Sequence, residues 1–291
     1  MISIKGLMKL IRPINCLMMG FAVIISMIIA SQGFPQINIL ILGFLTAFSL
    51  TAASMAINDY FDYDIDLINA PWRPLPSGLV SKTQAIICTL LFSIVGIISS
   101  LLINLECFIL ALIAIIVSVL YSFKGKKYGL LGNFMVSFCV ALPFLYGSLA
   151  VKARGSFLLQ IFSLAAFLAN TGREVAKGMV DVNGDTVKGI KTIAILYGLR
   201  IASLLTLIFY LLAVIVGLFP IIFRIVSWPY LPLYILSSLG FLVDSIQLTI
   251  NPTAENAKNV KRRTLIYMFL AMLAVFLGGL KFKLTYWWCE Y

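Results

Sequence analysis

The sequence predicts an all-α fold, an integral membrane bundle of nine transmembrane helices, and three observations support it. The chain of 291 residues is 62% hydrophobic and only 11% charged, which is far more apolar than a soluble domain. Its apolar residues form nine runs of about 15–21 residues, near the roughly 20 that cross a bilayer as a helix. Basic residues gather in segments between alternate runs. We therefore expect a single polytopic membrane domain over residues 1–291.

The nine runs follow one another without a low-complexity segment or a flexible linker. Basic residues precede the first run, so a signal peptide is the alternative there, but eight further runs favour a retained helix. The predicted spans cover residues 14–31, 38–57, 84–103, 107–121, 134–151, 156–174, 199–219, 230–249 and 264–280.

The charges of the connecting segments predict the orientation of the bundle. With nine spans, the N-terminal segment and the loops after spans 2, 4, 6 and 8 share one face, and they hold 17 of the 22 basic residues. The positive-inside rule places that face in the cytoplasm. We therefore expect a multi-pass protein of the cell membrane with its N-terminus inside and its C-terminus outside.

The loops after spans 2 and 6 are the longest, at roughly 25 residues, and loops of that length are commonly functional. Three prolines between Pro71 and Pro76 predict an extended path for the first of these loops. Ser81 and Gln84 then have the spacing of a capping box, which predicts the start of the third span.

Two short segments hold six of the 11 acidic residues, and each segment follows an apolar run. In the first, Asn58, Asp62 and Asp66 are spaced i, i+4, i+8, and Asp59 lies three residues before Asp62. A helix would bring these four residues to one broad face. Asp64 falls outside that face.

The second acidic segment holds Asp181 and Asp185, again four residues apart. Carboxylates in so apolar a chain are costly unless they hold something positive. Two facing groups of carboxylates suit hard divalent cations, most naturally Mg²⁺ that bridges to the phosphates of a substrate. The alternatives are a solvated helix end for the first segment and, for the second, a helix face salt-bridged through Arg173, Glu174 and Lys177. The candidate catalytic residues are Asn58, Asp59, Asp62, Asp66, Asp181 and Asp185.

Basic residues surround the acidic segments on the same face of the membrane. Arg73, in its proline-rich loop, and Lys177, near the second carboxylate pair, are the better candidates for binding phosphate oxygens. Membrane topology alone also explains such charges, and for the run 261–263 topology and anionic lipid headgroups are the favoured interpretation. Asp244, inside span 8, is either a functional group or a hydrogen-bonded packing residue. The candidate substrate-binding residues are Asn58, Arg73, Lys124, Lys126, Lys177, Lys188 and Lys191.

The composition excludes several classes of protein. The chain has no histidine, so a histidine general base, a histidine-ligated metal or haem and a serine–histidine triad are all excluded. The net charge of +11 lies in loops between apolar runs and does not indicate nucleic acid. The five cysteines are scattered, with no Cys-x-x-Cys, and predict no disulfide framework.

Three motifs occur together at the expected spans: Asn58-Asp59-x-x-Asp62-x-x-x-Asp66, Arg73-Pro-x-Pro-Ser-Gly and Asp181-x-x-x-Asp185. This combination resembles the UbiA superfamily of intramembrane prenyltransferases. Within it, Gly172-Arg173-Glu174-x-x-Lys177 and Gly189-x-Lys191-Thr192 are most similar to the branch of archaeal digeranylgeranylglyceryl phosphate synthases. The family's Tyr-x-x-x-Lys motif falls on Tyr121, where Gly125 stands at the lysine position, so Lys124 or Lys126 takes that role.

The resemblance implies a Mg²⁺-dependent prenyltransferase with a tunnel for an isoprenoid tail. The implied metal ligands are Asp62, Asp66, Asp181 and Asp185, which would hold the diphosphate of a polyprenyl donor through the metal. The implied reaction moves a geranylgeranyl group from its diphosphate to geranylgeranylglyceryl phosphate and forms the second ether bond of archaeal membrane lipids. The expected partners are the polyprenyl diphosphate donor, a lipid-like acceptor and membrane lipids, with no nucleic acid and no obligate protein partner.

Other functions stay open on the sequence. Within the same class, the acceptor is alternatively an aromatic ring in quinone biosynthesis or another ring compound. Outside the class, a cation-coupled transporter would use the carboxylates as an ion site near the bilayer centre, whereas these motifs lie at the ends of spans. A purely structural membrane protein would leave the clusters of charge unexplained.

Overall fold

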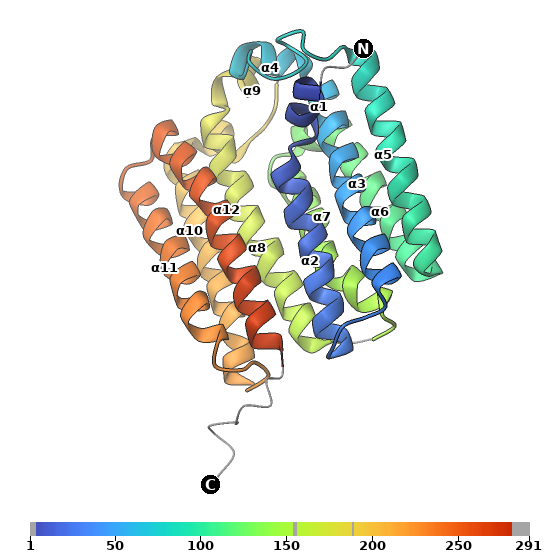
Figure 1. Ribbon diagram of the computed structural model, residues 1–291. Coiled ribbons are helices and arrows are strands. Elements are labelled where there is room, and N and C mark those ends of the chain that lie inside the picture. The colour runs from blue at the N-terminus through green and yellow to red at the C-terminus, as the bar shows by residue number, and fades with distance from the viewer. Residues whose placement is uncertain (1–3, 154–155, 188, 281–291) are drawn as a thin grey trace.

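The computed structural model describes residues 4–153, 156–187 and 189–280, and within these ranges the chain is helical with no strand (Figure 1). The helices are, in chain order, α1 Ile4–Ile11, α2 Pro13–Ser31, α3 Ile37–Phe61, α4 Tyr63–Asn69, α5 Lys82–Ile103, α6 Leu105–Phe123, the 3₁₀ helix η1 Gly125–Tyr128, α7 Leu130–Ala150, α8 Phe157–Val180, α9 Val182–Val187, α10 Ile193–Ile222, α11 Tyr230–Ile250 and α12 Ala254–Gly279.

Nine of the helices in the described ranges are long, and each contains most of one predicted span. Seven of them, α2, α3, α5, α6, α7, α10 and α11, are long and apolar enough to cross a membrane. The helices α8 and α12 are equally long but carry several charged residues and are not among the seven. The all-α prediction is therefore confirmed, whereas nine crossings stay a prediction.

The helices α10 and α12 begin well before their predicted spans. The spans predicted to begin at residues 199 and 264 start as helices at Ile193 and Ala254. Each start is capped by a threonine: Thr192 accepts a hydrogen bond from the N–H of Ile195, and Thr253 accepts one from the N–H of Asn256. The polar first turn of α12 therefore forms despite its low hydropathy. The first turn of α10 is apolar, and the non-helical backbone of Gly198 (φ +86°) separates it from the predicted span.

The predicted capping box at the start of α5 is confirmed. The N–H of Gln84 donates to Ser81 Oγ at 3.2 Å, and the N–H of Ser81 donates to Gln84 Oε1 at 2.9 Å. These bonds satisfy backbone groups that a helix leaves unpaired at its N-terminus. The helix α5 therefore begins at Lys82, directly after the long loop.

The loop between α4 and α5 is compact, so the predicted extended path is wrong. The N–H of Ser77 donates to the carbonyl oxygen of Arg73, and the N–H of Val80 donates to that of Pro74, both at 3.0 Å. Gly78 has a φ of +73°, which glycine adopts readily. Proline fixes φ at a value that suits tight turns as well as extended chain. The folded loop brings Arg73 back toward α3 and α4.

The long helices lie side by side, and the short helices α1, α4 and α9 gather at one end of the bundle (Figure 1). The helix α8 packs against α7, α10 and α12, while α2 packs against α3 and α7. The polypeptide leaves α3 and α8 at this same end, directly before α4 and α9. Both acidic segments are thus carried to one end of the bundle.

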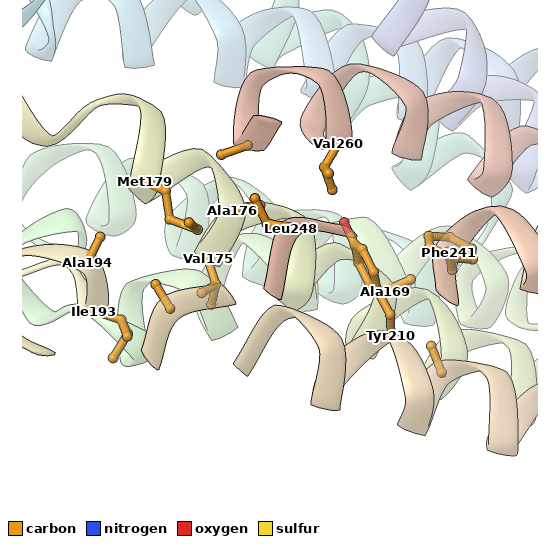
Figure 2. Packing of buried hydrophobic residues seen from close by; sticks show 13 residues of the cluster. Ala169, Val175, Ala176, Met179, Ile193, Ala194, Tyr210, Phe241, Leu248 and Val260 are labelled. Carbon is orange, nitrogen blue, oxygen red and sulfur yellow. The ribbon is translucent and has the colours of Figure 1, made fainter. Parts of the chain in front are cut away.

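A cluster of buried apolar side chains fixes the position of α8 (Figure 2). The rings of Tyr210 and Phe241 lie 4.9 Å apart, and the Tyr210 hydroxyl lies 2.7 Å from Thr264 Oγ1. A Cβ on Gly172 would lie 2.6 Å from the Tyr210 ring, so glycine is needed for α8 and α10 to approach this closely. This contact sets the register of the last turns of α8, which carry the charged residues of the site.

Candidate active site

The two acidic segments lie where α1, α4 and α9 gather (Figure 1). Asp59 is in the last turn of α3, Asp62 joins α3 to α4, and Asp66 lies in α4. Asp181 joins α8 to α9, and Asp185 lies in α9. The fold therefore brings together two segments that are far apart in the sequence.

The helical register continues through the junction of α3 and α4. The N–H of Asp62 donates to the carbonyl oxygen of Asn58 at 2.9 Å, and the N–H of Asp66 donates to that of Asp62 at 2.8 Å. Asp59, Asp62 and Asp66 are buried, whereas Asp64 is exposed. The face expected from the sequence spacing is the buried face.

Basic residues from distant parts of the chain pair with these aspartates. Arg12, between α1 and α2, pairs with Asp59. Lys126, in η1, pairs with Asp62, which also accepts a hydrogen bond from Asn58 Nδ2 at 2.9 Å. A charge buried in an apolar bundle is costly when it is alone, and each pairing offsets part of that cost. The pairs also tie α1, α3 and η1 to one another.

Arg73 makes the third pairing. Its Nη1 donates to both carboxylate oxygens of Asp66, at 2.7 and 2.6 Å, and lies 3.8 Å from Asp59 Oδ1. The pKa of Asp66 is nevertheless raised to about 6, because burial disfavours its charged form more than Arg73 favours it. Asp59 Oδ2 is buried and has no hydrogen-bond partner among the residues that the structure describes. An unpartnered buried carboxylate oxygen is a point at which a cation or a donor group would bind.

Asn69, the last residue of α4, joins the two acidic segments. Its Nδ2 donates to the carbonyl oxygen of Asp181 at 3.2 Å, and its Oδ1 accepts a hydrogen bond from the N–H of Gly184 at 3.0 Å. The first N–H groups of a helix have no partner within it, so Asn69 caps α9 from another helix. A Cβ on Gly184 would lie 2.3 Å from Asn69 Nδ2, which explains the glycine.

Asp185, in α9, is buried. Burial and then Asp181 raise its pKa to about 6, and Asp62 acts in the same direction. Lys177 and Lys126 act in the opposite direction. Because residues of both segments act on Asp185, the two segments share one electrostatic environment.

The structure distinguishes the lysines that the sequence left equivalent. Lys126 faces the site, and burial lowers its pKa. Lys124, Lys127 and Lys191 are exposed. Lys188 lies outside the described residues. Of the two candidates for the lysine motif after span 4, Lys126 is the one that contacts a site aspartate.

The last turns of α8 carry a second group of charges. Glu174, only 6% exposed, accepts hydrogen bonds from Arg173 Nη1 at 3.1 Å and from Lys177 Nζ at 3.0 Å. This is the salt-bridged helix face that the sequence offered as an alternative to a site. A salt-bridged helix face and a site are compatible interpretations, since Arg173, Glu174 and Lys177 all line the cavity described next.

A cavity of about 550 Å³ runs from these charges into the apolar interior of the bundle. Its polar end is lined by Arg12, Asn58, Arg73, Lys177 and Lys261. Its interior is lined by apolar and aromatic side chains, among them Phe144, Phe162, Tyr230, Tyr234 and Met272. An apolar cavity that begins at a group of cations suits a ligand with an anionic head and a long hydrocarbon tail.

Some residues that line the cavity were predicted from the sequence, and others were not. Asn58, Arg73 and Lys177 line it as candidates, and Asp59 and Asp66 are joined to it through their ion pairs with Arg12 and Arg73. Arg12 and Lys261 were assigned to topology and missed. No local signal marks Arg12, since its role depends on the distant Asp59.

The chemistry of the donor set suits a hard divalent cation. Within the described ranges, no three histidine, cysteine, aspartate or glutamate side chains converge as a ready-made metal cage. Mg²⁺ commonly takes one or two protein carboxylates and completes its coordination with substrate phosphates and water. The sequence predicts Asp62, Asp66, Asp181 and Asp185 as ligands of such a shared ion, and Asp59 adds a buried oxygen that has no hydrogen-bond partner in the described ranges.

Comparisons with known proteins show the family and the fold. The family model for the UbiA prenyltransferase family matches residues 19–273. A digeranylgeranylglyceryl phosphate synthase of Thermococcus sibiricus is 34% identical over 278 residues, which cover 96% of this chain and 98% of that protein. A solved structure of digeranylgeranylglyceryl phosphate synthase in membranes is 32% identical, with a TM-score of 0.76 over 96% of this chain and 99% of that one. A UbiA homolog from Archaeoglobus fulgidus bound to GPP and Mg²⁺ is 17% identical and shares the fold, with a TM-score of 0.63 over 93% of this chain and 99% of that one.

Replacing Asn69 by alanine should loosen the junction of the acidic segments. Gly184 loses the acceptor of its N–H, so we expect faster hydrogen exchange at that amide and a free energy of unfolding lower by about 1–3 kcal/mol. Exchange measured by mass spectrometry on peptides covering α9 checks this. Ile68→Ala, an exposed neighbour on α4, is the control and should leave α9 unchanged. Equal exchange in both variants would show that Asn69 does not hold α9.

Proposed function

The chain belongs to the UbiA prenyltransferase family, and on this premise we propose that it transfers a geranylgeranyl group from geranylgeranyl diphosphate to geranylgeranylglyceryl phosphate. The product would carry the second ether bond of archaeal membrane lipids. The observation that carries the proposal is the cavity, because its charged end and apolar interior match the head and tail of both substrates. The relatives compared above, named for this same product, support the choice of acceptor.

The carboxylates are the proposed ligands of Mg²⁺, with Asp62 and Asp66 on one ion and Asp181 and Asp185 on a second. When bound, the metal supplies positive charge that offsets the charge developing on the departing diphosphate. The burial of Asp62, Asp66 and Asp185 supports this assignment, since buried carboxylates gain most from a cation.

Arg73 and Lys126 are the proposed cations for the donor diphosphate, with Asn58 beside them. In the structure these two residues pair with Asp66 and Asp62, so binding of the donor exchanges one anionic partner for another. Such an exchange keeps every charge compensated while it frees the carboxylates. Lys177 lies at the same end of the cavity and serves the diphosphate or the acceptor phosphate.

The proposed reaction breaks the bond between C1 of the donor and its diphosphate oxygen, and the acceptor hydroxyl oxygen forms a bond to C1. Cationic side chains aimed at the leaving group stabilise the charge that develops on it. The hydroxyl proton leaves on an aspartate, on the departing diphosphate or on water, because the chain has no histidine. The isoprenoid tail would occupy the apolar interior of the cavity.

We also propose that the chain acts as one domain, residues 1–291, in the cell membrane. Nine crossings would put the N-terminus and the site on the cytoplasmic side, and the 17 basic residues of that face support this orientation. Seven helices suited to a membrane support the multi-pass arrangement. The position of the aspartates at one end of the bundle argues against a transporter with an ion site at its centre.

Turnover tests the proposal. Purified protein in detergent, given Mg²⁺ and labelled geranylgeranyl diphosphate, should convert geranylgeranylglyceryl phosphate to a diether, and EDTA should stop the reaction. Asp62→Asn should lower kcat/KM by at least about 100-fold, the size typical for loss of one electrostatic stabiliser. Asp64→Asn, the same substitution at an exposed aspartate, should stay within about twofold of the wild type.

Two outcomes would contradict different parts of this account. Product with 4-hydroxybenzoate in place of the lipid acceptor would keep the prenyl transfer and overturn the acceptor. Absence of transfer to either acceptor, in protein shown to be folded, would overturn the function itself.

The raised pKa values of Asp66 and Asp185 predict how metal binding depends on pH. A carboxyl group must lose its proton to bind Mg²⁺, and both groups have a pKa of about 6. Apparent affinity should therefore be nearly constant above about pH 7 and fall as the pH drops through 6, by up to about tenfold per pH unit for each carboxyl. Calorimetric titration with Mg²⁺ between pH 5 and 8 checks this. In Asp185→Asn the affinity for Mg²⁺ should depend less steeply on pH. An affinity that stays unchanged down to pH 4.5 in the wild type would contradict the prediction.

A further inference from the structure

The basic run 261–263 at the start of α12 divides into three different environments. Arg262 is exposed. Arg263 donates to Asp244 Oδ1 at 3.0 Å, and Asp244 also accepts from the Tyr267 hydroxyl at 2.8 Å. Asp244 therefore has a packing role. Lys261 is the member that lines the cavity.

Lys261 faces the charged turns of α8 across the polar end of the cavity. The helices α8 and α12 pack together, and Arg173, Lys177 and Lys261 all line this end. Lys261 is half-buried and makes no hydrogen bond or ion pair within the described part of the chain. Its charge interacts at longer range with Lys177, Asp181 and Glu174.

The charges on this side of the cavity do not cancel. Among the described residues, Glu174 is the single carboxylate in contact with Arg173 and Lys177, and it must balance Lys261 as well. Three cations against one carboxylate leave an excess of two positive charges, of which the more distant Asp181 offsets a part. Arg173 Nε is also buried without a hydrogen-bond partner in the described ranges. Unbalanced charge and an unused buried donor are costly at the edge of an apolar cavity unless an anion binds there.

The first acidic segment differs in this respect. There, three cations face the three buried carboxylates: Arg12 pairs with Asp59, Lys126 with Asp62 and Arg73 with Asp66, and Arg73 also lies 3.8 Å from Asp59. An anion that binds on that side needs accompanying cations, as a metal-bound diphosphate has. An anion on the α8 and α12 side needs none, because the protein already supplies the excess charge.

We propose that Arg173 and Lys261, with Lys177 between them and the aspartates, bind the phosphate of the acceptor. The inference rests on the proposed function and assigns the two phosphate-bearing substrates to opposite sides of the cavity. A phosphate monoester carries about −1.5 to −2 charges at pH 7, which matches the excess. Arginine offers a planar fork of donors for phosphate oxygens, and lysine adds a compact charge. The exposed lysines 124, 127 and 191 do not line the cavity and take no part in this subsite.

The test compares two acceptors that differ only in the phosphate. Geranylgeranylglyceryl phosphate and its neutral alcohol, geranylgeranylglycerol, are offered to the wild type and to Lys261→Met. A charge-assisted contact contributes about 10- to 100-fold to affinity, so the variant should lose that factor in kcat/KM for the phosphate acceptor, mainly through KM. Its kcat/KM for the neutral alcohol and its KM for the donor diphosphate should stay within about twofold of the wild type.

Two further variants separate recognition from folding. Lys258→Met removes the same charge from an exposed position one turn earlier on α12. It should leave kcat/KM for both acceptors unchanged. Lys261→Arg keeps the charge and should restore most of the preference for the phosphate acceptor.

An equal loss with both acceptors, or a raised KM for the donor instead, would overturn the subsite. So would a Lys261→Met enzyme with the wild-type preference. If the wild type transfers to neither acceptor, the proposed function is refuted. The results with the variants test only the subsite.

Discussion

The structure depends on one constraint: charges placed in an apolar bundle must be compensated. The aspartates of α3 and α4 are met by Arg12, Arg73 and Lys126, which come from three other parts of the chain. Each ion pair joins two different elements. The pairs therefore also hold α1, the loop before α5 and η1 around the end of the bundle. The site is therefore assembled by the same ion pairs that make its charges tolerable.

The charges on the two sides of the cavity are balanced to different degrees, and this difference decides which anion each side can bind. On the α3 side each of the three buried aspartates is paired with a cation, whereas the α8 and α12 side has a surplus of positive charge. A set of ion pairs can exchange partners when a metal and a diphosphate arrive together. A cationic surplus can receive a phosphate alone. The apolar cavity between them gives both hydrocarbon tails a common direction into the bundle.

Features set by local sequence could be predicted, and features set by contact between distant segments could not. The long helices, the capping box at Ser81 and the shared face of Asp59, Asp62 and Asp66 follow from spacing and hydropathy within one segment. The choice of Lys126 over Lys124 depends on η1, which turns one lysine toward Asp62. The compact loop before α5 was missed because proline suits turns as well as extended chain. Lys261 was assigned to topology because the sequence does not distinguish it from Arg262 and Arg263. In the structure Arg262 is exposed and Arg263 pairs with Asp244, so only Lys261 of the three lines the cavity.

The most direct test of the account is an experimental structure with Mg²⁺ and a non-reactive geranylgeranyl thiodiphosphate. We expect Arg73 and Lys126 to leave Asp66 and Asp62 and to contact the diphosphate, with the metal beside the freed carboxylates and the tail inside the cavity. A diphosphate bound elsewhere, with the ion pairs of Asp62 and Asp66 intact, would contradict the central claim that these pairs are exchanged for substrate.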